Sequence, residues 1–353
     1  MRILFCIPTL GGGGAERQVR LLVKEFARRG VAIGLLTRFE GRDLDELRGH
    51  GVACVPIGDI GNHNPRLPLV VAREAAGGKW DIVQSWIAQM DVLVGLCAPL
   101  GAFRWVLSER SAPIHYVRGW KNALRKRLGA RADLVVANSK SGLAYWRDEP
   151  VRKTLIPNAI DFVAIGEKLT AEPTARAGGE PLILSIGRFD RWKNFAPLIL
   201  AQAALRDQGR PARLVILGDG PLRHSLEKLI SDLSLADRVE LPGFVPDVRQ
   251  WLTRADLFVS ISLYEGQPNA VLEAAAARVP AVLSGIKEHR ELMLGVAMFT
   301  DPHDPRDIAG GIARLLDNPA LARKYAQAAH ARIEGQSVEA VATRYLECYA
   351  QLF

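Results

Sequence analysis

The chain has 353 residues, of which 48% are hydrophobic, and its formal net charge at pH 7 is +8. Because single hydrophobic cores stop growing near about 250–300 residues, this length predicts two domains. No apolar run reaches the roughly 20 residues of a membrane-spanning helix, and the first residues do not resemble a signal peptide, so we expect a globular protein of the cytoplasm.

The four cysteines, Cys6, Cys54, Cys97 and Cys348, are scattered along the chain. They form no Cys-x-x-C pair and have no histidine cluster nearby, which argues against a disulfide framework and against a zinc site. We expect them to be reduced thiols that pack in the interior.

The first half alternates short β-branched runs with amphipathic stretches, which is the pattern of a parallel sheet with helical crossovers. Strands are expected at Arg2–Pro8, Val31–Thr37, Val52–Ile57, Asp81–Trp86, Trp105–Ser108, Leu134–Ala137 and Thr154–Ile156. The residues from Glu16 to Arg29 carry Val19, Leu22 and Phe26 at helical spacing, which predicts an amphipathic helix with one buried face.

A run of four glycines, Gly11–Gly14, lies between the first strand and this helix. Unhindered backbone and helix-end amides can approach a phosphate or a sugar oxygen there, although a tight turn would need glycine too. The predicted acceptor or phosphate loop consists of Gly12, Gly13, Gly14 and Glu16.

A dinucleotide fingerprint is the rival interpretation of this loop. It would place its third glycine at Glu16 or Arg17, and an acid after the second strand, where the chain has Thr37 and Arg38. We therefore do not expect NAD.

The positive charge lies in the first half. Residues 1–170 contain 25 Lys and Arg against 16 Asp and Glu, a net +9, whereas residues 171–353 contain 21 against 22, a net −1. The segment from Arg110 to Ala132 holds seven of these cations and no acid. Such a segment favours an anionic neighbour.

Aromatic residues are interleaved with the cations of this segment, which suits a surface of anionic lipid. A solvated basic helix is the simpler alternative, and nucleic acid is not expected because no recognition motif accompanies the charge. The predicted membrane contacts are Trp120, Lys121, Arg125, Lys126 and Arg127.

Residues 166–181 have the polar, Gly- and Pro-containing composition of a linker, and the strand pattern then restarts. Further strands are expected at Leu182–Gly187, Arg213–Leu217, Val239–Leu241, Leu257–Ser262, Ala281–Leu283 and Met298–Thr300. The fold predicted is α/β, with two doubly wound Rossmann-like domains at residues 1–170 and 171–336 and a final helix over 337–353 that can pack back on the first domain. We expect the active site in the cleft between the domains.

Two cations follow the first strand of the second domain. Arg188 and Lys193 come just past its carboxyl end, so both can converge on one anion, and Gly187 before them indicates a shaped loop rather than two exposed surface cations.

A second loop, after the strand Leu257–Ser262, carries Glu265 before a Gly-Gln-Pro-Asn turn, and Glu273 lies on the alanine-rich helix that follows. An ordinary helix start would also favour acids there. The amides of that helix near Asn269 and Ala270 can bind a diphosphate together with the two cations. Ionised Glu accepts two hydrogen bonds from a vicinal diol. A ligand with a sugar at each end of a diphosphate is a nucleotide sugar.

The motifs together resemble the retaining nucleotide-sugar glycosyltransferases of family 4, which have the GT-B fold. The resemblance rests on two glutamates separated by seven residues, Glu265 and Glu273, and on the preceding cations Arg188 and Lys193. It also rests on the segments "GGGGAER", "LGDGPLR" and "LPGFVPDV". It covers essentially the whole chain and is strongest from Leu182 to Arg290.

The resemblance implies roles for these positions. Glu265 would contact the donor sugar and Glu273 the ribose diol, while Arg188 and Lys193 would neutralise the departing diphosphate. Further donor-binding residues implied are Gly187, Phe244, Val245, Gly266, Pro268, Asn269 and Ala270. Relatives work without a metal, so we expect no cofactor, and we do not expect a metal at the Asp-x-Asp of Asp43–Asp45, which lies in a charged surface stretch.

One position departs from the family pattern. Many relatives have a histidine after the strand that corresponds to Trp105–Ser108, whereas this chain has Glu109 and Arg110. Either residue can take over a polar contact to acceptor or phosphate, or neither does, and His115 is a near substitute by sequence only.

The predicted function is transfer of a hexose or N-acetylhexosamine from a nucleotide sugar to a polyprenyl-diphosphate-linked or other lipid-linked saccharide, and we expect the donor to be UDP-linked. Relatives with Gly-Gly-Ala-Glu-Arg near their starts often extend such glycans at the inner face of the cytoplasmic membrane, where we expect this chain to bind peripherally. The alternatives are a soluble transferase with a small-molecule acceptor, a GDP-mannose-dependent mannosyltransferase, a GT-B epimerase or phosphorylase, and a non-catalytic nucleotide-sugar-binding protein.

Overall fold

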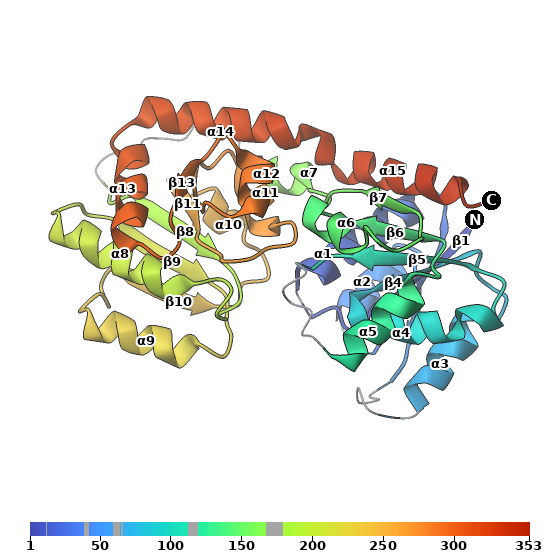
Figure 1. Ribbon diagram of the computed structural model, residues 1–353. Coiled ribbons are helices and arrows are strands. Elements are labelled where there is room, and N and C mark those ends of the chain that lie inside the picture. The colour runs from blue at the N-terminus through green and yellow to red at the C-terminus, as the bar shows by residue number, and fades with distance from the viewer. Residues whose placement is uncertain (12, 39–41, 59–63, 65, 112–118, 167–178) are drawn as a thin grey trace. The chain divides into compact units, whose positions relative to one another are not determined.

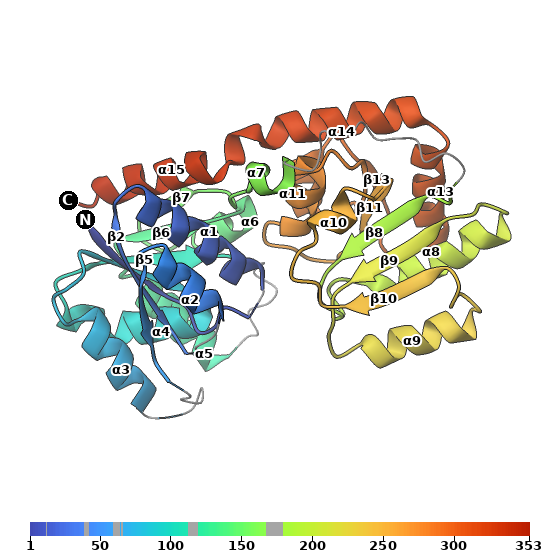
Figure 2. The same ribbon diagram turned by 180° about the vertical axis from the view of Figure 1, so that it is seen from behind.

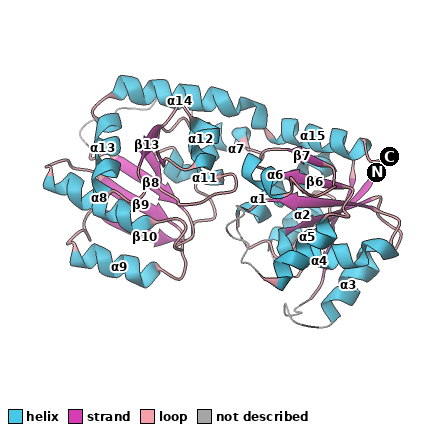
Figure 3. Cartoon of the chain, in the orientation of Figure 1, coloured by secondary structure: helices cyan, strands magenta, loops and turns pink. Residues whose placement is uncertain are grey.

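The computed structural model describes residues 1–11, 13–38, 42–58, 64, 66–111, 119–166 and 179–353. Contacts divide the chain into two compact units: Met1–Ala159 with Gln336–Phe353 form unit 1, and Ile160–Gly335 form unit 2. In each unit a parallel sheet lies between layers of helices (Figure 1 and Figure 3). The prediction of two doubly wound α/β domains is confirmed.

The sheet of unit 1 has seven parallel strands in the order β3-β2-β1-β4-β5-β6-β7. They are β1 Arg2–Cys6, β2 Ala32–Thr37, β3 Ala53–Pro56, β4 Ile82–Trp86, β5 Arg104–Glu109, β6 Leu134–Ala137 and β7 Lys153–Leu155. The strand order reverses between β1 and β4, so the loops that leave these two strands separate at the carboxyl edge, where such sheets bind ligands.

Helices cover both faces of this sheet, and their apolar sides form its two cores. One face carries α1 Gly14–Arg28, α2 Arg42–Gly49 and α15 Val338–Ala350. Of these, α1 and α2 are at the front in Figure 2. The other carries α3 Arg66–Ala75, α4 Ile87–Cys97, the short η1 Ala98–Leu100, α5 Trp120–Gly129 and α6 Lys140–Tyr145. Among the described helices of the chain, none has the length and apolar composition to cross a bilayer.

The last helix, α15, belongs to the core of unit 1. Ser337 caps it by accepting a hydrogen bond from the Ala340 N–H, and the side chains of Tyr345 and Tyr349 are fully buried. The Tyr345 ring meets the Phe26 ring of α1 edge to face, with 6.4 Å between the centroids. These contacts show that the final helix packs on the first domain, as we expected.

The sheet of unit 2 has six parallel strands in the order β10-β9-β8-β11-β12-β13, so its order reverses between β8 and β11. The strands are β8 Leu182–Ile186, β9 Arg213–Leu217, β10 Val239–Gly243, β11 Leu257–Ser260, β12 Ala281–Ser284 and β13 Met298–Thr300. One face carries α8 Phe195–Asp207, α9 Arg223–Asp232 and α13 Pro305–Leu316. The other carries α7 Phe162–Gly166, α10 Arg249–Leu252, α11 Asn269–Ala276, α12 Lys287–Met293 and α14 Pro319–Ile333, and η3 Glu334–Gln336 follows α14.

The predicted domain boundary at 170/171 is later than the one the contacts define. Unit 2 already begins at Ile160, because Ile160 and Ile165 of the α7 region are buried in its core beneath α11. Most of the segment read as a linker, residues 167–178, lies outside the described residues.

Candidate active site

A charged pair lies where the strand order of unit 2 reverses. Lys193 follows β8 and Glu265 follows β11, the two strands that flank the reversal. Lys193 Nζ is 2.6 Å from Glu265 Oε1, and the Lys193 side chain is 25% exposed and the Glu265 side chain 11%. The structure thus brings together two of the three predicted catalytic residues.

Local backbone geometry places the lysine. The Asp190 carboxylate accepts hydrogen bonds from the N–H groups of Trp192 (2.9 Å) and Lys193 (3.1 Å), which closes the turn. The Lys193 methylene groups pack over Gly187, where a Cβ would come within 3.0–3.1 Å of them. Gly218, with φ +143°, lies so close beneath that a Cβ would be 1.9 Å from the Gly187 carbonyl oxygen. Both glycines are required by close packing.

The Glu265 carboxylate is ionised. Burial favours the neutral form, but the charge of Lys193 and hydrogen bonds from Lys193 and Ser262 outweigh it and hold the pKa of Glu265 below its ordinary value. An ionised carboxylate accepts hydrogen bonds only, so it is suited to hydroxyl groups of a ligand.

Arg188 and the start of α11 complete the donor set predicted for a diphosphate. The Arg188 side chain is exposed, and none of the described residues pairs with its guanidinium. Pro268 is the N-cap of α11 and provides no side-chain cap, so the helix that begins with Asn269 and Ala270 has first-turn amides suited to an anion. Gly266 lies in the half-buried turn before it.

The remaining predicted donor residues lie in unit 2 as well. Glu273 is 7% exposed on α11, whose neighbouring side chains Val271 and Leu272 pack in the core. Phe244 follows β10 and is 58% exposed, while Val245 beside it is half-buried. Their contacts with ribose and base stay predictions.

Sequence reasoning did not identify His289, which is fully buried on α12 and interacts electrostatically with both Glu265 and Lys193. Burial lowers the pKa of His289 to about 4, so its ring is neutral at pH 7. The only signal available was its position after a strand of the parallel sheet, where polar residues gather.

In unit 1 the glycine loop already holds a carboxylate. Glu16 accepts hydrogen bonds from the Gly13 N–H and from the Thr9 hydroxyl, so it caps the N-terminus of α1 that begins at Gly14. A phosphate at this helix end would have to displace Glu16. Gly12 lies outside the described residues.

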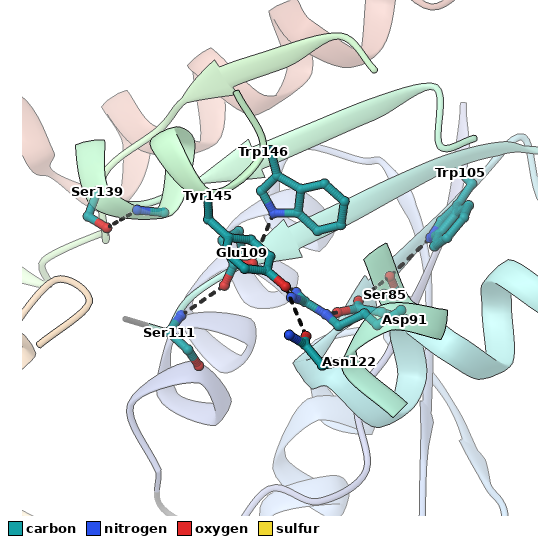
Figure 4. Close-up of polar contacts among 11 residues, drawn as sticks. Ser85, Asp91, Trp105, Glu109, Ser111, Asn122, Ser139, Tyr145 and Trp146 are labelled. Carbon is teal, nitrogen blue, oxygen red and sulfur yellow. Dashed lines mark hydrogen bonds and ion pairs between the residues drawn. The ribbon is translucent and has the colours of Figure 1, made fainter. Parts of the chain in front are cut away.

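Glu109 belongs to a buried polar cluster and does not face a ligand. Its carboxylate accepts hydrogen bonds from Arg125 (3.0 Å), the Trp146 indole (3.0 Å) and the Ser111 N–H (3.2 Å), and its side chain is fully buried. Figure 4 shows Glu109 between Trp146 and Ser111. The prediction that Glu109 contacts acceptor or phosphate is therefore wrong.

Arg125 is the cation of this cluster and is not a membrane residue. Its guanidinium binds the Asp91 carboxylate at 2.7 Å as well as Glu109, and its side chain is 2% exposed. Ser85 donates a further hydrogen bond of 2.6 Å to Asp91 (Figure 4). Burial raises the pKa of Asp91 to about 6, although the charge of Arg125 and the hydrogen bond from Ser85 lower it; the charge of Glu109 also raises it.

The rest of the basic helix α5 is exposed to varying degrees. Trp120 is 71% exposed, with the Lys121 ammonium 5.8 Å from its ring centroid, and Arg127 is exposed. Lys126 pairs with Glu149 at 3.2 Å and is half-buried. Of the predicted membrane residues, Trp120, Lys121 and Arg127 have the required exposure.

Arg110 contacts neutral side chains within unit 1. Its guanidinium lies 4.4 Å from the Trp86 ring centroid and donates hydrogen bonds to Asn158 Oδ1 (3.0 Å) and to the Tyr345 hydroxyl. Burial lowers the pKa of Arg110 to about 9. A role toward the acceptor stays a prediction, and His115 lies outside the described residues.

Among the residues that the structure describes, no three His, Cys, Asp or Glu side chains are grouped as metal ligands would be. Lys193, paired with Glu265, and the exposed Arg188 are the two cations predicted for the diphosphate in unit 2.

Replacement of Arg125 by alanine is expected to destabilise the protein by about 3–5 kcal/mol, because it leaves two buried carboxylates without a cation. Arg127→Ala, on the exposed side of the same helix, is the matched control and should change the free energy of unfolding by less than about 0.5 kcal/mol. Urea denaturation followed by circular dichroism measures both. Equal effects of the two substitutions would contradict the structural role of Arg125.

Comparison with family models agrees with this division of the chain. Residues 12–163 match the model described as Glycosyltransferase Family 4, and residues 167–332 match the model described as Glycosyl transferases group 1. Together the two matches account for most of both units.

Characterised relatives span nearly the full length. The chain is 28% identical to an N-acetylgalactosamine-N,N'-diacetylbacillosaminyl-diphospho-undecaprenol 4-alpha-N-acetylgalactosaminyltransferase of Campylobacter jejuni, over 92% of this chain and 93% of that protein. It is also 28% identical to the lipopolysaccharide core biosynthesis glycosyltransferase LpsE of Rhizobium meliloti, over 96% of each chain.

Solved structures share the fold. HepE of Anabaena, crystallised with UDP and glucose, superposes with a TM-score of 0.86 at 19% identity over 99% of this chain and 100% of that one. Sucrose-phosphate synthase of Thermosynechococcus elongatus gives a TM-score of 0.81 at 21% identity over 100% and 99% of the two chains. The chain therefore belongs to the group 1 and family 4 glycosyltransferases, and it has the GT-B fold.

Proposed function

We propose that this glycosyltransferase moves a hexose or N-acetylhexosamine from a UDP-linked donor to a polyprenyl-diphosphate-linked or other lipid-linked saccharide during assembly of cell-surface polysaccharide. The observation that carries the donor half is the Lys193–Glu265 pair, which joins a cation and a hydroxyl acceptor at the strand reversal of unit 2. Unit 2 would thus bind the donor and unit 1 the acceptor.

The charges of the site suit a departing nucleoside diphosphate. Lys193 would turn from Glu265 to the diphosphate, joined by Arg188 and the first-turn amides of α11, and Glu265 would then accept hydrogen bonds from the sugar hydroxyls. Together these groups can stabilise the leaving charge, so we propose that catalysis needs no metal. Glu273 would bind the ribose diol, and the backbone near Phe244 and Val245 the base.

We propose that the anomeric configuration is retained, as the resemblance implies. The bond from the anomeric carbon to the diphosphate oxygen breaks, and a bond to the acceptor hydroxyl oxygen forms on the same face of the sugar. The acceptor proton passes to the departing phosphate oxygen. No enzyme nucleophile takes part in this scheme.

Two kinds of observation support a lipid-linked acceptor. The name of the Campylobacter jejuni relative contains a diphospho-undecaprenol acceptor, and LpsE acts in lipopolysaccharide core biosynthesis. In unit 1, α5 exposes Trp120 together with Lys121 and Arg127, which suits anionic headgroups. We therefore propose peripheral binding to the inner face of the cytoplasmic membrane.

A small-molecule acceptor is the second candidate. A 2-deoxystreptamine glucosyltransferase of Streptomyces kanamyceticus is 28% identical to this chain, although over only 40% of it. A transferase of that kind would need no membrane surface, so binding to anionic vesicles distinguishes the two.

Glu265→Gln is expected to reduce sugar transfer by at least about 10²-fold, because the neutral amide keeps the shape but loses the charge and one acceptor position. Transfer is measured with UDP-glucose and UDP-N-acetylglucosamine, in EDTA, to a polyprenyl-diphosphate-linked saccharide. Glu227→Gln, at an exposed ion pair of α9, is the matched control and should retain full activity. Near-normal transfer by Glu265→Gln in a folded protein would remove Glu265 from the reacting centre.

Lys121→Glu combined with Arg127→Glu is expected to weaken co-sedimentation with phosphatidylglycerol vesicles by about tenfold or more, because each cation near an anionic surface contributes about 1 kcal/mol. The control reverses two exposed cations of unit 2, Lys228 and Arg210, with the same change in net charge. If both double variants sediment alike, or if the wild type does not bind vesicles, α5 is not a membrane surface.

A further inference from the structure

His289 is a buried histidine beside the Lys193–Glu265 pair, and the proposed function does not yet use it. Its side chain is fully buried on α12, the helix that follows β12. β12 is the parallel neighbour of β11 in the sheet, so the helix that carries His289 and the loop that carries Glu265 follow strands that end at the same edge.

The hydrogen bonds around Ser284 fix the position of the ring proton. The Ser284 hydroxyl donates its single proton to the Ser262 carbonyl oxygen at 2.6 Å. Toward His289 Nδ1, at 2.9 Å, Ser284 Oγ can therefore only accept. The other neighbour of Nδ1 is the Ser284 carbonyl oxygen at 3.2 Å, which is also an acceptor. Nδ1 must carry the hydrogen.

The other ring nitrogen then presents a lone pair. His289 is neutral at pH 7, because burial lowers its pKa to about 4. Nε2 is buried and has no hydrogen-bond partner in the described part of the chain. A buried acceptor without a donor is costly, so a ligand that supplies a donor gains from meeting it.

A chain of polar contacts joins this acceptor to the candidate site. The Ser262 hydroxyl donates to the Glu265 carboxylate, and the Ser262 carbonyl oxygen accepts from Ser284, which in turn accepts from His289. The charges of Glu265 and Lys193 also act on the imidazole. Glu265 and His289 Nε2 are thus two acceptors supported by one hydrogen-bonded network.

We propose that His289 determines donor-sugar specificity: its Nε2 accepts a hydrogen bond from one hydroxyl or amide N–H of the transferred sugar, beside the group that Glu265 accepts. The inference rests on the proposed function, since it needs a sugar nucleotide in unit 2. Movement of Lys193 to the diphosphate would make room for the sugar between these acceptors. Two acceptors repel a sugar carboxylate, so the site selects a neutral sugar over a uronic acid.

The test compares each nucleotide sugar with its own nucleoside diphosphate, because only the former has the group that His289 would bind. Affinities are measured by calorimetry in EDTA for UDP, UDP-glucose, UDP-N-acetylglucosamine and UDP-glucuronic acid, and for GDP and GDP-mannose. We expect the wild type to bind one neutral nucleotide sugar more tightly than its diphosphate, and UDP-glucuronic acid no more tightly than UDP.

His289→Asn keeps a hydrogen-bond donor for Ser284 but removes Nε2. It should weaken binding of the nucleotide sugar by about tenfold, while the affinity for the nucleoside diphosphate stays within about twofold. His289→Gln places an amide near the Nε2 position and should restore part of the loss. His330→Asn is the matched control, because His330 Nδ1 also faces backbone carbonyl oxygens in unit 2, those of Ala275 and Ala276. It should leave both affinities unchanged.

Deoxy analogues of the bound sugar give an independent measurement on the wild type. Removal of one sugar hydroxyl should lower the affinity of the wild type for the nucleotide sugar by about tenfold, and should not lower the affinity of His289→Asn any further. The inference is overturned, while the donor site stands, if neither a deoxy position nor a His289 substitution changes the affinity for the nucleotide sugar. It is also overturned if the substitution weakens binding of the nucleotide sugar and of the nucleoside diphosphate equally. If the wild type binds none of the nucleotides, the proposed donor site fails, and this inference with it.

Discussion

The parallel order of both sheets is the constraint on which the chemistry of this protein depends. Parallel strands end at one edge, and where the strand order reverses the loops separate and leave room for a ligand. In unit 2 that reversal lies between β8 and β11, which is why residues as distant in the chain as Lys193 and Glu265 come within 2.6 Å. The proposed donor site depends on this contact between Lys193 and Glu265.

Two ionic clusters, one fully buried and one partly exposed, show how differently one chain can use charge. Arg125 is 2% exposed and bound to two carboxylates, so it holds α5 to the sheet and offers nothing to a ligand. Lys193 is 25% exposed and bound to one carboxylate, and Arg188, five residues earlier in the chain, pairs with none of the described residues. A cation that can exchange one anion for another is what transfer from a diphosphate requires.

The strands, the positions of Arg188, Lys193 and Glu265 just after them, and the two-domain α/β fold could be predicted, because β-branched runs and the residues that follow them are local properties of the sequence. The partners of a side chain are not local. Arg125 was indistinguishable within a run of cations, since the buried carboxylates that hold it belong to other elements. Glu16 was expected to meet a ligand but caps its own helix, and His289 gave no motif at all.

The central claim is that unit 2 binds a nucleoside diphosphate through Arg188 and Lys193 without a metal. The most direct measurement is the thermal stabilisation of the wild type and of Arg188→Ala by UDP, GDP, ADP and TDP in EDTA, because selective binding raises the melting temperature by mass action. The account predicts a shift with one nucleotide, most plainly UDP, that disappears in Arg188→Ala. No shift with any nucleotide, with and without anionic vesicles, or an equal shift in the variant, would contradict it.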